Sequence, residues 1–294
     1  MNAVLLSCSD LRIDVDGVAL IDGLSCTAGQ ERVALLGAWE PLFRYLTGQA
    51  ELARGSCELV GLDARHAVQS GQVGLVCHDP PLPPLWSVAE YVQKSAELAG
   101  LGVGRAREAT RTSLAELGVA ALATRRASSL SAPERRVVQI AQALVTDPSA
   151  LLLEQPLGEL DEAGQELVAV FLQRAAAKRG LLCSFRAAPT AGAERSLLDS
   201  SESVLWLQDG RLLASGPPAT VLAGSTTYRV LALCHVARLC RELEQRGCRV
   251  HSLGQADDDA GSRLLVVLPD GASADSILDA ALSAEAAIVE LVPA

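Results

Sequence analysis

The chain has 294 residues, a formal net charge of −10 and an apolar fraction of 49 %. This length suits one large domain or a main domain with a smaller one, and this apolar content excludes an intrinsically disordered chain. Nucleic acids and anionic membranes require clustered basic residues, so the acidic balance argues against both as partners. No uncharged apolar run is long enough to span a bilayer, and the N-terminus lacks the basic start of a signal peptide. We therefore expect a cytoplasmic protein.

Eight cysteines are scattered singly through the chain, without the paired spacing that zinc sites and disulfide frameworks show. We expect them to be reduced thiols that fill space in the core. A metal site would require one sequence cluster to converge, namely Cys234, His235, Cys240, Cys248 and His251. The prediction is that no metal is bound.

In chain order, the first 225 residues predict an α/β domain. Strand-like runs cover residues 4–37 and end at Gly37, and a short helix-like piece follows at 41–48. Another strand ends at His78, before a loop that is rich in proline, which neither continues a helix nor donates to a strand ladder. Helical spacing marks a helical subdomain over about 88–147. The remaining expected elements are strands near 73–78, 149–156 and 181–185, helices at 132–147 and 162–179, a loop at 186–202 and a hairpin at 204–215.

A change in composition near residues 216–227 predicts a domain boundary, which we place between 225 and 226. Beyond it the pattern is strand, helix, strand, strand, helix, strand, which is the order of a ferredoxin-like α+β domain. The acidic turn at Asp257, Asp258 and Asp259 is expected to be a solvated hairpin tip, because it lacks the alternating ligand spacing of a calcium loop. This second domain covers 226–294.

The first domain resembles the nucleotide-binding domain of an ATP-binding-cassette (ABC) transporter of the export type. The strongest stretch is LSAPERRVVQIAQALVTDPSALLLEQPLGELD at 130–161, which is similar to the signature loop, Walker B strand and D-loop in their usual order. Residues 73–92 resemble the Q-loop region. The resemblance implies a P-loop NTPase fold with a helical subdomain, and it makes the second domain a small C-terminal extension.

The segment that would bind phosphates departs from this family pattern. Family members have glycines, a lysine and a hydroxyl side chain after the first core strand, whereas Gly37 is followed here by a shorter segment that contains Trp39 and Glu40. The chain has only two lysines, Lys94 and Lys178, and neither follows a glycine-rich loop. A carboxylate at this place repels a phosphate. We therefore expect a plain strand-to-helix connection.

The signature loop also differs, since Ser131, Ala132, Pro133 and Glu134 replace the family's Ser-Gly-Gly-Gln. These residues form a predicted capping box, in which Ser131 accepts from the third helical amide and Glu134 accepts from the Ser131 amide. A helix start that its own carboxylate satisfies is a poor site for the γ-phosphate of a nucleotide.

The residues that would carry hydrolysis are replaced as well. Glu154 stands at the magnesium-binding aspartate and Gln155 at the general base, and glutamine cannot accept a proton from water. His78 stands at the Q-loop glutamine and Arg186 at the switch histidine. The first strand, at Asp14 and Val15, offers no aromatic ring to adenine, and the D-loop retains only Asp161.

These substitutions predict a catalytically inactive cassette, that is, a pseudo-ATPase. We expect it to bind neither ATP nor Mg²⁺. Its predicted role is structural or regulatory, beside a membrane subunit and a second cassette, or as a homodimer, at the inner face of the membrane. The loop with His78, Pro83 and Trp86 is a candidate contact for that membrane subunit, although it could equally cover its own core. Two alternatives remain open: a half of an asymmetric ATPase that binds nucleotide weakly, and a sensor that binds a ligand through the C-terminal domain.

Overall fold

In the computed structural model, which describes residues 4–29, 31–78, 80–223, 227–255, 261–269, 272 and 274–293, the chain divides into two units. The first unit is Met1–Pro218 and the second is Ala219–Ala294. The predicted boundary between 225 and 226 falls on residues outside those that the structure describes. Each unit has its own apolar core.

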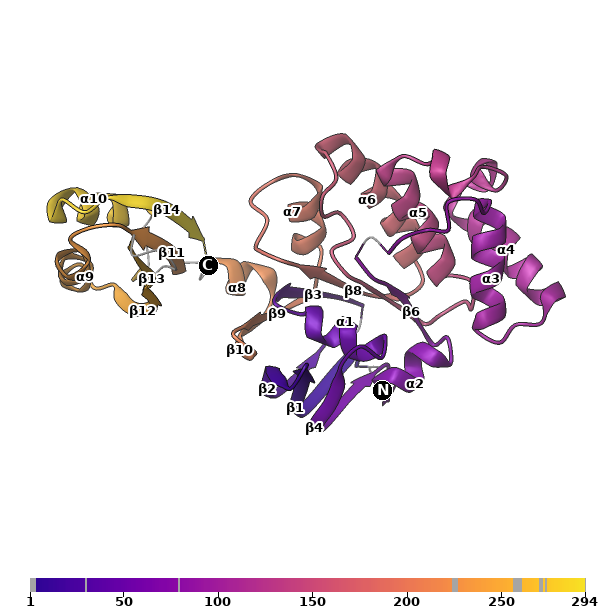
Figure 1. The fold of residues 1–294 in the computed structure, drawn as a ribbon, viewed down its shortest axis with the longest axis horizontal. Helices are drawn as coiled ribbons and strands as arrows, with labels where there is room; N and C mark the ends of the chain where they lie inside the picture. Colours follow the sequence, from indigo (N-terminus) through magenta and orange to yellow (C-terminus); the bar gives the residue numbers. More distant parts are fainter. Residues whose placement is uncertain are drawn as a thin grey trace. The chain divides into compact units, whose positions relative to one another are not determined.

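Two sheets build the first unit (Figure 1). An antiparallel sheet has the order β2-β1-β4-β5, and a six-stranded sheet has the order β10-β9-β3-β8-β7-β6, parallel except at β10. The strands of the first sheet are β1 (Leu6–Val15), β2 (Val18–Ala28), β4 (Glu51–Leu59) and β5 (Leu62–Asp63). Those of the second are β3 (Arg32–Gly37), β6 (Val73–Val76), β7 (Ala150–Leu153), β8 (Gly180–Phe185), β9 (Ser203–Gln208) and β10 (Arg211–Gly216).

The helices of the first unit are short to medium in length, and one more, α8, begins at the last residue of that unit and continues in the second. They are α1 (Glu40–Leu46), α2 (Ala64–Gln69), α3 (Val88–Leu98), α4 (Val103–Leu117), α5 (Ala132–Ala143), α6 (Glu162–Ala176), α7 (Gly192–Asp199) and α8 (Pro218–Ala223), with 3-10 turns η1 (Ala120–Leu122) and η2 (Ala127–Ser129). Helix α5 packs against α3, α4, α6 and β6, so it connects the helical subdomain to the parallel sheet.

The main core lies between the two sheets and α1. Strand β7 is buried along its whole length, as expected for an interior parallel strand covered on both faces. The antiparallel strands alternate buried and exposed positions, and Leu11 and Ile13 of β1 point inward. The predicted α/β fold is confirmed.

Three local predictions were wrong or incomplete. Helix α5 ends at Ala143, before the expected end at residue 147, because the following turns close with bonds to residues three positions back and Thr146 donates its hydroxyl to the Gly71 carbonyl instead. The expected loop at 186–202 contains α7, an eight-residue helix that is anchored by buried Leu198. Helix α2 was not predicted; Asp63 caps its first turn.

The second unit is a four-stranded antiparallel sheet with two helices, α9 (Val236–Gln245) and α10 (Asp275–Ala284). Its strands are β11 (Thr227–Ala232), β12 (Arg249–Gln255), β13 (Ser262–Val267) and β14 (Ile288–Pro293). The sheet order β12-β13-β11-β14 is that of a ferredoxin-like fold, in which the first and third strands lie in the centre. The predicted fold of this domain is therefore confirmed. Asp257, Asp258 and Asp259 lie outside the described residues.

Candidate functional site

The residues singled out by sequence gather at one edge of the parallel sheet. Gly37 ends β3, His78 follows β6, Glu154 and Gln155 follow β7, and Arg186 follows β8. Because these strands run parallel, their carboxyl ends meet at the same edge, which is where open α/β sheets bind ligands. The topology thus brings the candidate residues together, and their contacts decide what this edge can bind.

Trp39 fills the turn between β3 and α1. Its side chain is 1 % exposed, and its indole N–H lies 3.1 Å from the Leu36 carbonyl and 3.2 Å from the Leu205 carbonyl. Gly37 is held against β9, where an added Cβ would lie 2.0 Å from the Leu207 carbonyl oxygen, at a φ of +95°. The turn is therefore packed directly onto β9 by an aromatic side chain.

Two backbone amides of this turn already have acceptors. Ala38 donates to the Leu207 carbonyl at 3.3 Å, and Trp39 donates to the Gly37 carbonyl at 3.0 Å. Pro41, in the first turn of α1, has no N–H to offer. The Glu40 carboxylate begins the helix and pairs with Arg44, whose Nη2 lies 2.6 Å away. A phosphate would need free amides at this point and would meet a carboxylate.

The ends of β6 and β7 are tied together by Glu154. This side chain is buried, and its Oε2 accepts the His78 backbone N–H at 2.9 Å, while the Glu154 amide donates to the Val76 carbonyl at 2.8 Å. Burial, with the Glu154 carboxylate nearby, raises the pKa of Cys77 to about 11. Glu154 therefore links the ends of β6 and β7 through hydrogen bonds of its side chain and its backbone.

Gln155 adopts a left-handed backbone conformation, with φ at +45°. The Gln155 backbone N–H donates to the Ser184 hydroxyl on β8 at 3.0 Å. The neighbouring His78 side chain lies across from Glu159, with 3.5 Å between Nε2 and Oε1. The Gln155 side chain itself cannot take a proton from water, since an amide is not a base.

The capping box at the start of α5 forms as the sequence predicts. Glu134 donates its backbone N–H to the Ser131 hydroxyl at 3.4 Å, and the Glu134 carboxylate accepts the Ser131 N–H at 2.8 Å. Arg125 adds an ion pair to the same carboxylate. The Ser131 N–H, together with this guanidinium, holds the pKa of Glu134 below its ordinary range. The helix start is thus satisfied from within the chain.

The same region packs against the start of α6. Asp161 caps α6 by accepting the Gly164 amide at 2.9 Å. A Cβ at Gly164 would lie 2.9 Å from Pro133 Cγ and 2.8 Å from Asp161 Oδ1, so only glycine fits between them. Pro133 and Asp161, which the sequence assigned to the signature and D-loop segments, are brought side by side. Ala132 begins α5 next to them.

The loop before α3 is held in place yet presents apolar surface. The Trp86 amide donates to the Pro83 carbonyl at 3.2 Å, and the Trp86 carbonyl accepts from Ala127 at 2.9 Å. The side chains of Trp86 and Leu85 remain 39 % and 74 % exposed. A shallow hollow of about 300 Å³ beside this loop is lined by Pro80, Pro81, Leu82, Pro84, Ala127, Ser128 and Arg135.

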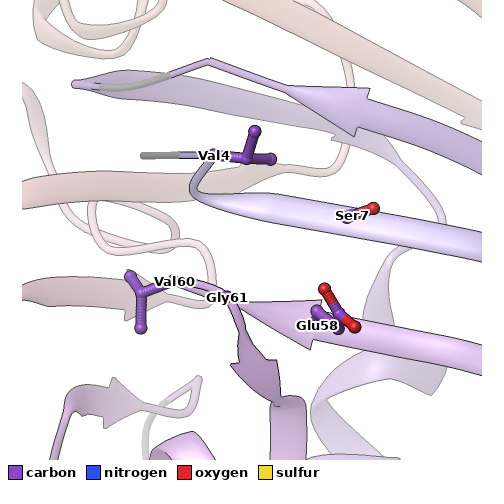
Figure 2. Close-up of a pocket in the computed structure, with 5 residues that line it drawn as sticks. All are labelled: Val4, Ser7, Glu58, Val60 and Gly61. Atoms are coloured by element: carbon purple, nitrogen blue, oxygen red, sulfur yellow. The ribbon is translucent and has the colours of Figure 1, made fainter. Parts of the chain in front are cut away.

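Two candidate residues remain, Arg186 after the end of β8 and Asp14 on β1. Arg186 is exposed, and Asp14 forms an ion pair with Arg12 at 2.9 Å. A second hollow of about 300 Å³ lies at the start of the antiparallel sheet, away from the candidate site, and is lined by Val4, Ser7, Glu58, Val60 and Gly61 (Figure 2).

The residues that the structure describes include no group of three or more His, Cys, Asp or Glu side chains that could hold a metal ion. The cluster from Cys234 to His251 therefore does not converge into a metal-binding group there. Within the same described ranges, no helix is long and apolar enough to cross a membrane.

Several contacts of the site were not predicted from the sequence. They are the Ser184 hydroxyl under Gln155, the Arg125 guanidinium on Glu134, and the Gln139 amide, which donates to the Pro80 carbonyl at 3.2 Å. Arg125 and Glu134 are nine positions apart in a segment of turns, so no periodic pattern in the sequence predicts their ion pair.

Comparison with known proteins identifies similar chains. Residues 41–158 match the family described as ABC transporter. The lipoprotein-releasing system ATP-binding protein LolD of Chromohalobacter salexigens is 27 % identical over 227 residues, covering 72 % of this chain and 94 % of LolD. The Fe(3+) ions import ATP-binding protein FbpC of Streptomyces coelicolor is 30 % identical over 234 residues, covering 75 % of this chain and 64 % of FbpC. The macrolide export ATP-binding/permease protein MacB of Chromobacterium violaceum is 28 % identical over 226 residues, covering 72 % of this chain and 34 % of MacB.

Solved structures with the same fold include cbiO1 from Clostridium perfringens, which is part of the ABC transporter complex cbiONQ. It matches with a TM-score of 0.60 at 21 % identity and covers 75 % of this chain and 91 % of cbiO1. A bacterial Atm1-family ABC exporter with ATP bound matches with a TM-score of 0.59 at 20 % identity, covering 76 % of this chain and 40 % of the exporter. These matches concern the fold.

Proposed function

We propose that this chain, which carries an ABC transporter ATP-binding domain, is a catalytically inactive cassette that serves as a structural or regulatory subunit of an export-type transporter or a transporter-derived machine. Any ATP hydrolysis then takes place in a partner subunit. The observation that carries the proposal is the buried Trp39 in the turn between β3 and α1, where a phosphate would have to lie.

Three features of the same turn support this reading. Two of its amides are bonded to backbone carbonyls, Pro41 lacks an amide hydrogen, and Glu40 contributes a negative charge. The family match begins at residue 41, after Gly37, Trp39 and Glu40. Phosphate-binding loops depend on several free amides and a lysine, and this turn has neither arrangement.

Two further places support inactivity independently of that turn. The Gln155 side chain, after the end of β7, has no proton-accepting capacity, and the Gln155 backbone N–H donates to the Ser184 hydroxyl. At α5, the Glu134 carboxylate occupies the Ser131 N–H and pairs with Arg125, so the helix start presents a carboxylate instead of a site for a phosphate. A competent site would need all three places restored.

Phosphate release from Mg-ATP by the purified full-length chain tests the proposal. The related LolD of Chromohalobacter salexigens, measured at the same concentration, is the positive control. The expected result is no release above the buffer background from this chain at any protein concentration. Release that scales with protein concentration and disappears on adding EDTA would refute the inactive assignment and favour the asymmetric ATPase half.

We also propose that the loop with His78, Pro83 and Trp86 contacts a membrane subunit, which would hold the chain at the inner face of the membrane beside a second cassette. Rigid prolines and an exposed aromatic ring are typical of interface anchors, and the exposed Trp86 and Leu85 side chains fit that chemistry.

The variant Trp86→Ala should reduce the fraction of the chain that sediments with membranes of its native cell. The control Leu98→Ala removes an apolar side chain that is 83 % exposed on α3, outside the loop, and should leave that fraction unchanged. A wild-type chain that stays monomeric in the supernatant would contradict this assignment.

A further inference from the structure

Three cysteines form one rung across the antiparallel sheet. Cys8 of β1 is the register partner of Cys26 on β2 and of Cys57 on β4, and these strands lie side by side (Figure 1). Residues that are direct neighbours across antiparallel strands point to the same face. One position along each strand, Ser7 and Glu58 are also partners and belong to the opposite face, at the hollow in Figure 2.

The three thiols point toward the main core. Cys8 and Cys57 are buried in it, with 3.7 Å between their sulfur atoms, and Cys26 packs against its margin and is half-buried. Cross-strand partners in antiparallel strands have Cα atoms about 4.5–5.5 Å apart, which lies within the Cα separation that a disulfide bridges, so side-chain rotation and a small backbone adjustment bring the sulfur atoms together. Cys8 occupies the middle of the rung, so two different disulfides are possible and both include Cys8.

Access to the rung is uneven. A reagent in solution reaches Cys26 first, because the other two sulfurs are covered by the core. The hydrogen bond to Cys8 and burial raise the pKa of the Cys26 thiol above its ordinary range. A raised pKa leaves little thiolate at neutral pH, so reaction at Cys26 is slow and becomes faster as the pH increases.

We propose that Cys26, Cys8 and Cys57 form a disulfide site that a low-molecular-weight disulfide oxidises through Cys26. The Cys26 thiolate attacks one sulfur of the reagent, which breaks the reagent's S–S bond, releases one thiol and leaves a mixed disulfide. Cys8 then attacks the Cys26 sulfur, releases the second thiol and forms the Cys8–Cys26 bond. The two cysteines are oxidised, the reagent is reduced to two thiols, and the two protons pass to those thiols.

Cys57 adds a second step without further oxidation. Its thiolate attacks the Cys8 sulfur, forms the Cys8–Cys57 bond and returns Cys26 to the thiol form. The resulting disulfide lies in the buried pair, where a solution thiol cannot reach it directly, so it is reduced only by the reverse exchange through Cys26. The final disulfide is therefore buried within the sheet. It links two cysteines that are 49 positions apart in the chain.

Treatment of the full-length protein with oxidised glutathione, followed by peptide mapping, tests this proposal. Cys234 is exposed in the second unit and serves as the internal control, since it should carry glutathione as a stable mixed disulfide. Cys26 should carry none at completion, and the map should contain a Cys8–Cys57 peptide pair. The oxidised protein should unfold several degrees higher than the reduced one, as expected for a cross-link over a long loop.

Variants separate the steps. Cys57→Ser should stop at the Cys8–Cys26 disulfide, and Cys8→Ser should leave glutathione on Cys26. The proposal is overturned if the wild-type protein retains glutathione on Cys26, if Cys234 reacts fully while the rung remains reduced, or if Cys8→Ser forms a Cys26–Cys57 disulfide. The wild-type map alone decides the matter should a variant fail to fold, and the outcome is independent of nucleotide binding.

Discussion

The packing of Trp39 makes a quantitative prediction for the substitution Trp39→Ala. Removing a fully buried aromatic side chain costs about 3–5 kcal/mol of unfolding free energy, because the lost burial is compounded by the cavity that remains. Two carbonyls, those of Leu36 and Leu205, also lose their indole donor. We expect the first unit to lose about 4 kcal/mol in total.

One further variant divides that loss into its parts, and another is a control at an exposed tryptophan. Trp39→Phe keeps most of the aromatic burial and removes the N–H, so it should cost about 1–2 kcal/mol. Trp86→Ala removes a tryptophan that is 39 % exposed and should cost at most about 1 kcal/mol. Urea unfolding followed by circular dichroism gives all three values from the shift of the first unit's transition.

The same variants are then titrated with Mg-ATP. Trp39→Ala should still fail to bind, since the occupied amides, Pro41 and the Glu40 carboxylate all remain. A Trp39→Ala variant as stable as Trp86→Ala would show that Trp39 does not stabilise the first unit. Mg-ATP binding by Trp39→Ala would show that Trp39 only covers an otherwise intact phosphate site.

Three other predictions concern separate contacts. Glu134→Gln should lower the unfolding free energy by about 1 kcal/mol at neutral pH, because it weakens the helix cap and the ion pair with Arg125. The folded state lowers the pKa of Glu134, so this stabilisation is present above the ordinary pKa of a glutamate and disappears as the pH falls through the lowered pKa. The unfolding midpoints of the wild type and the variant should therefore converge in acid. Gln155→Glu should release no phosphate from Mg-ATP in a malachite-green assay, since restoring a base does not restore a phosphate site; activity in this variant would place the defect at Gln155 alone. Arg179→Met should lower the free energy of unfolding in urea by about 2 kcal/mol, because the Arg179 side chain is 7 % exposed and joins Glu116 of α4 to the Pro148 carbonyl. The control Arg111→Met, at an exposed arginine, should change it by no more than about 0.5 kcal/mol.

The larger features of the fold follow from local patterns. The nearly all-apolar run at 149–156 predicts a strand covered on both faces in a parallel sheet, as β7 is, and the strand-helix order after residue 226 predicts the ferredoxin-like sheet. The cap at Ser131 was also predictable, because a capping box is a contact between residues three positions apart. Patterns of this kind depend on neighbours in the sequence, so a single chain reveals them.

Other features depend on contacts between distant residues, which periodicity does not encode. The Arg125 pair, the Ser184 hydroxyl under Gln155 and the thiol rung on Cys8 all join segments whose register is fixed only by the folded sheet or helix packing. Helix α7 was missed because eight residues after a proline-containing turn give too short an amphipathic pattern.

Calorimetric titration of the purified full-length chain with Mg-ATP to millimolar concentration tests the central claim most directly. We expect no binding heat beyond dilution, whereas LolD of Chromohalobacter salexigens should give a saturable signal under the same conditions. Saturable one-to-one binding to this chain would contradict the account, since the turn that holds Trp39 would then accommodate phosphates, and the asymmetric ATPase half would become the better description.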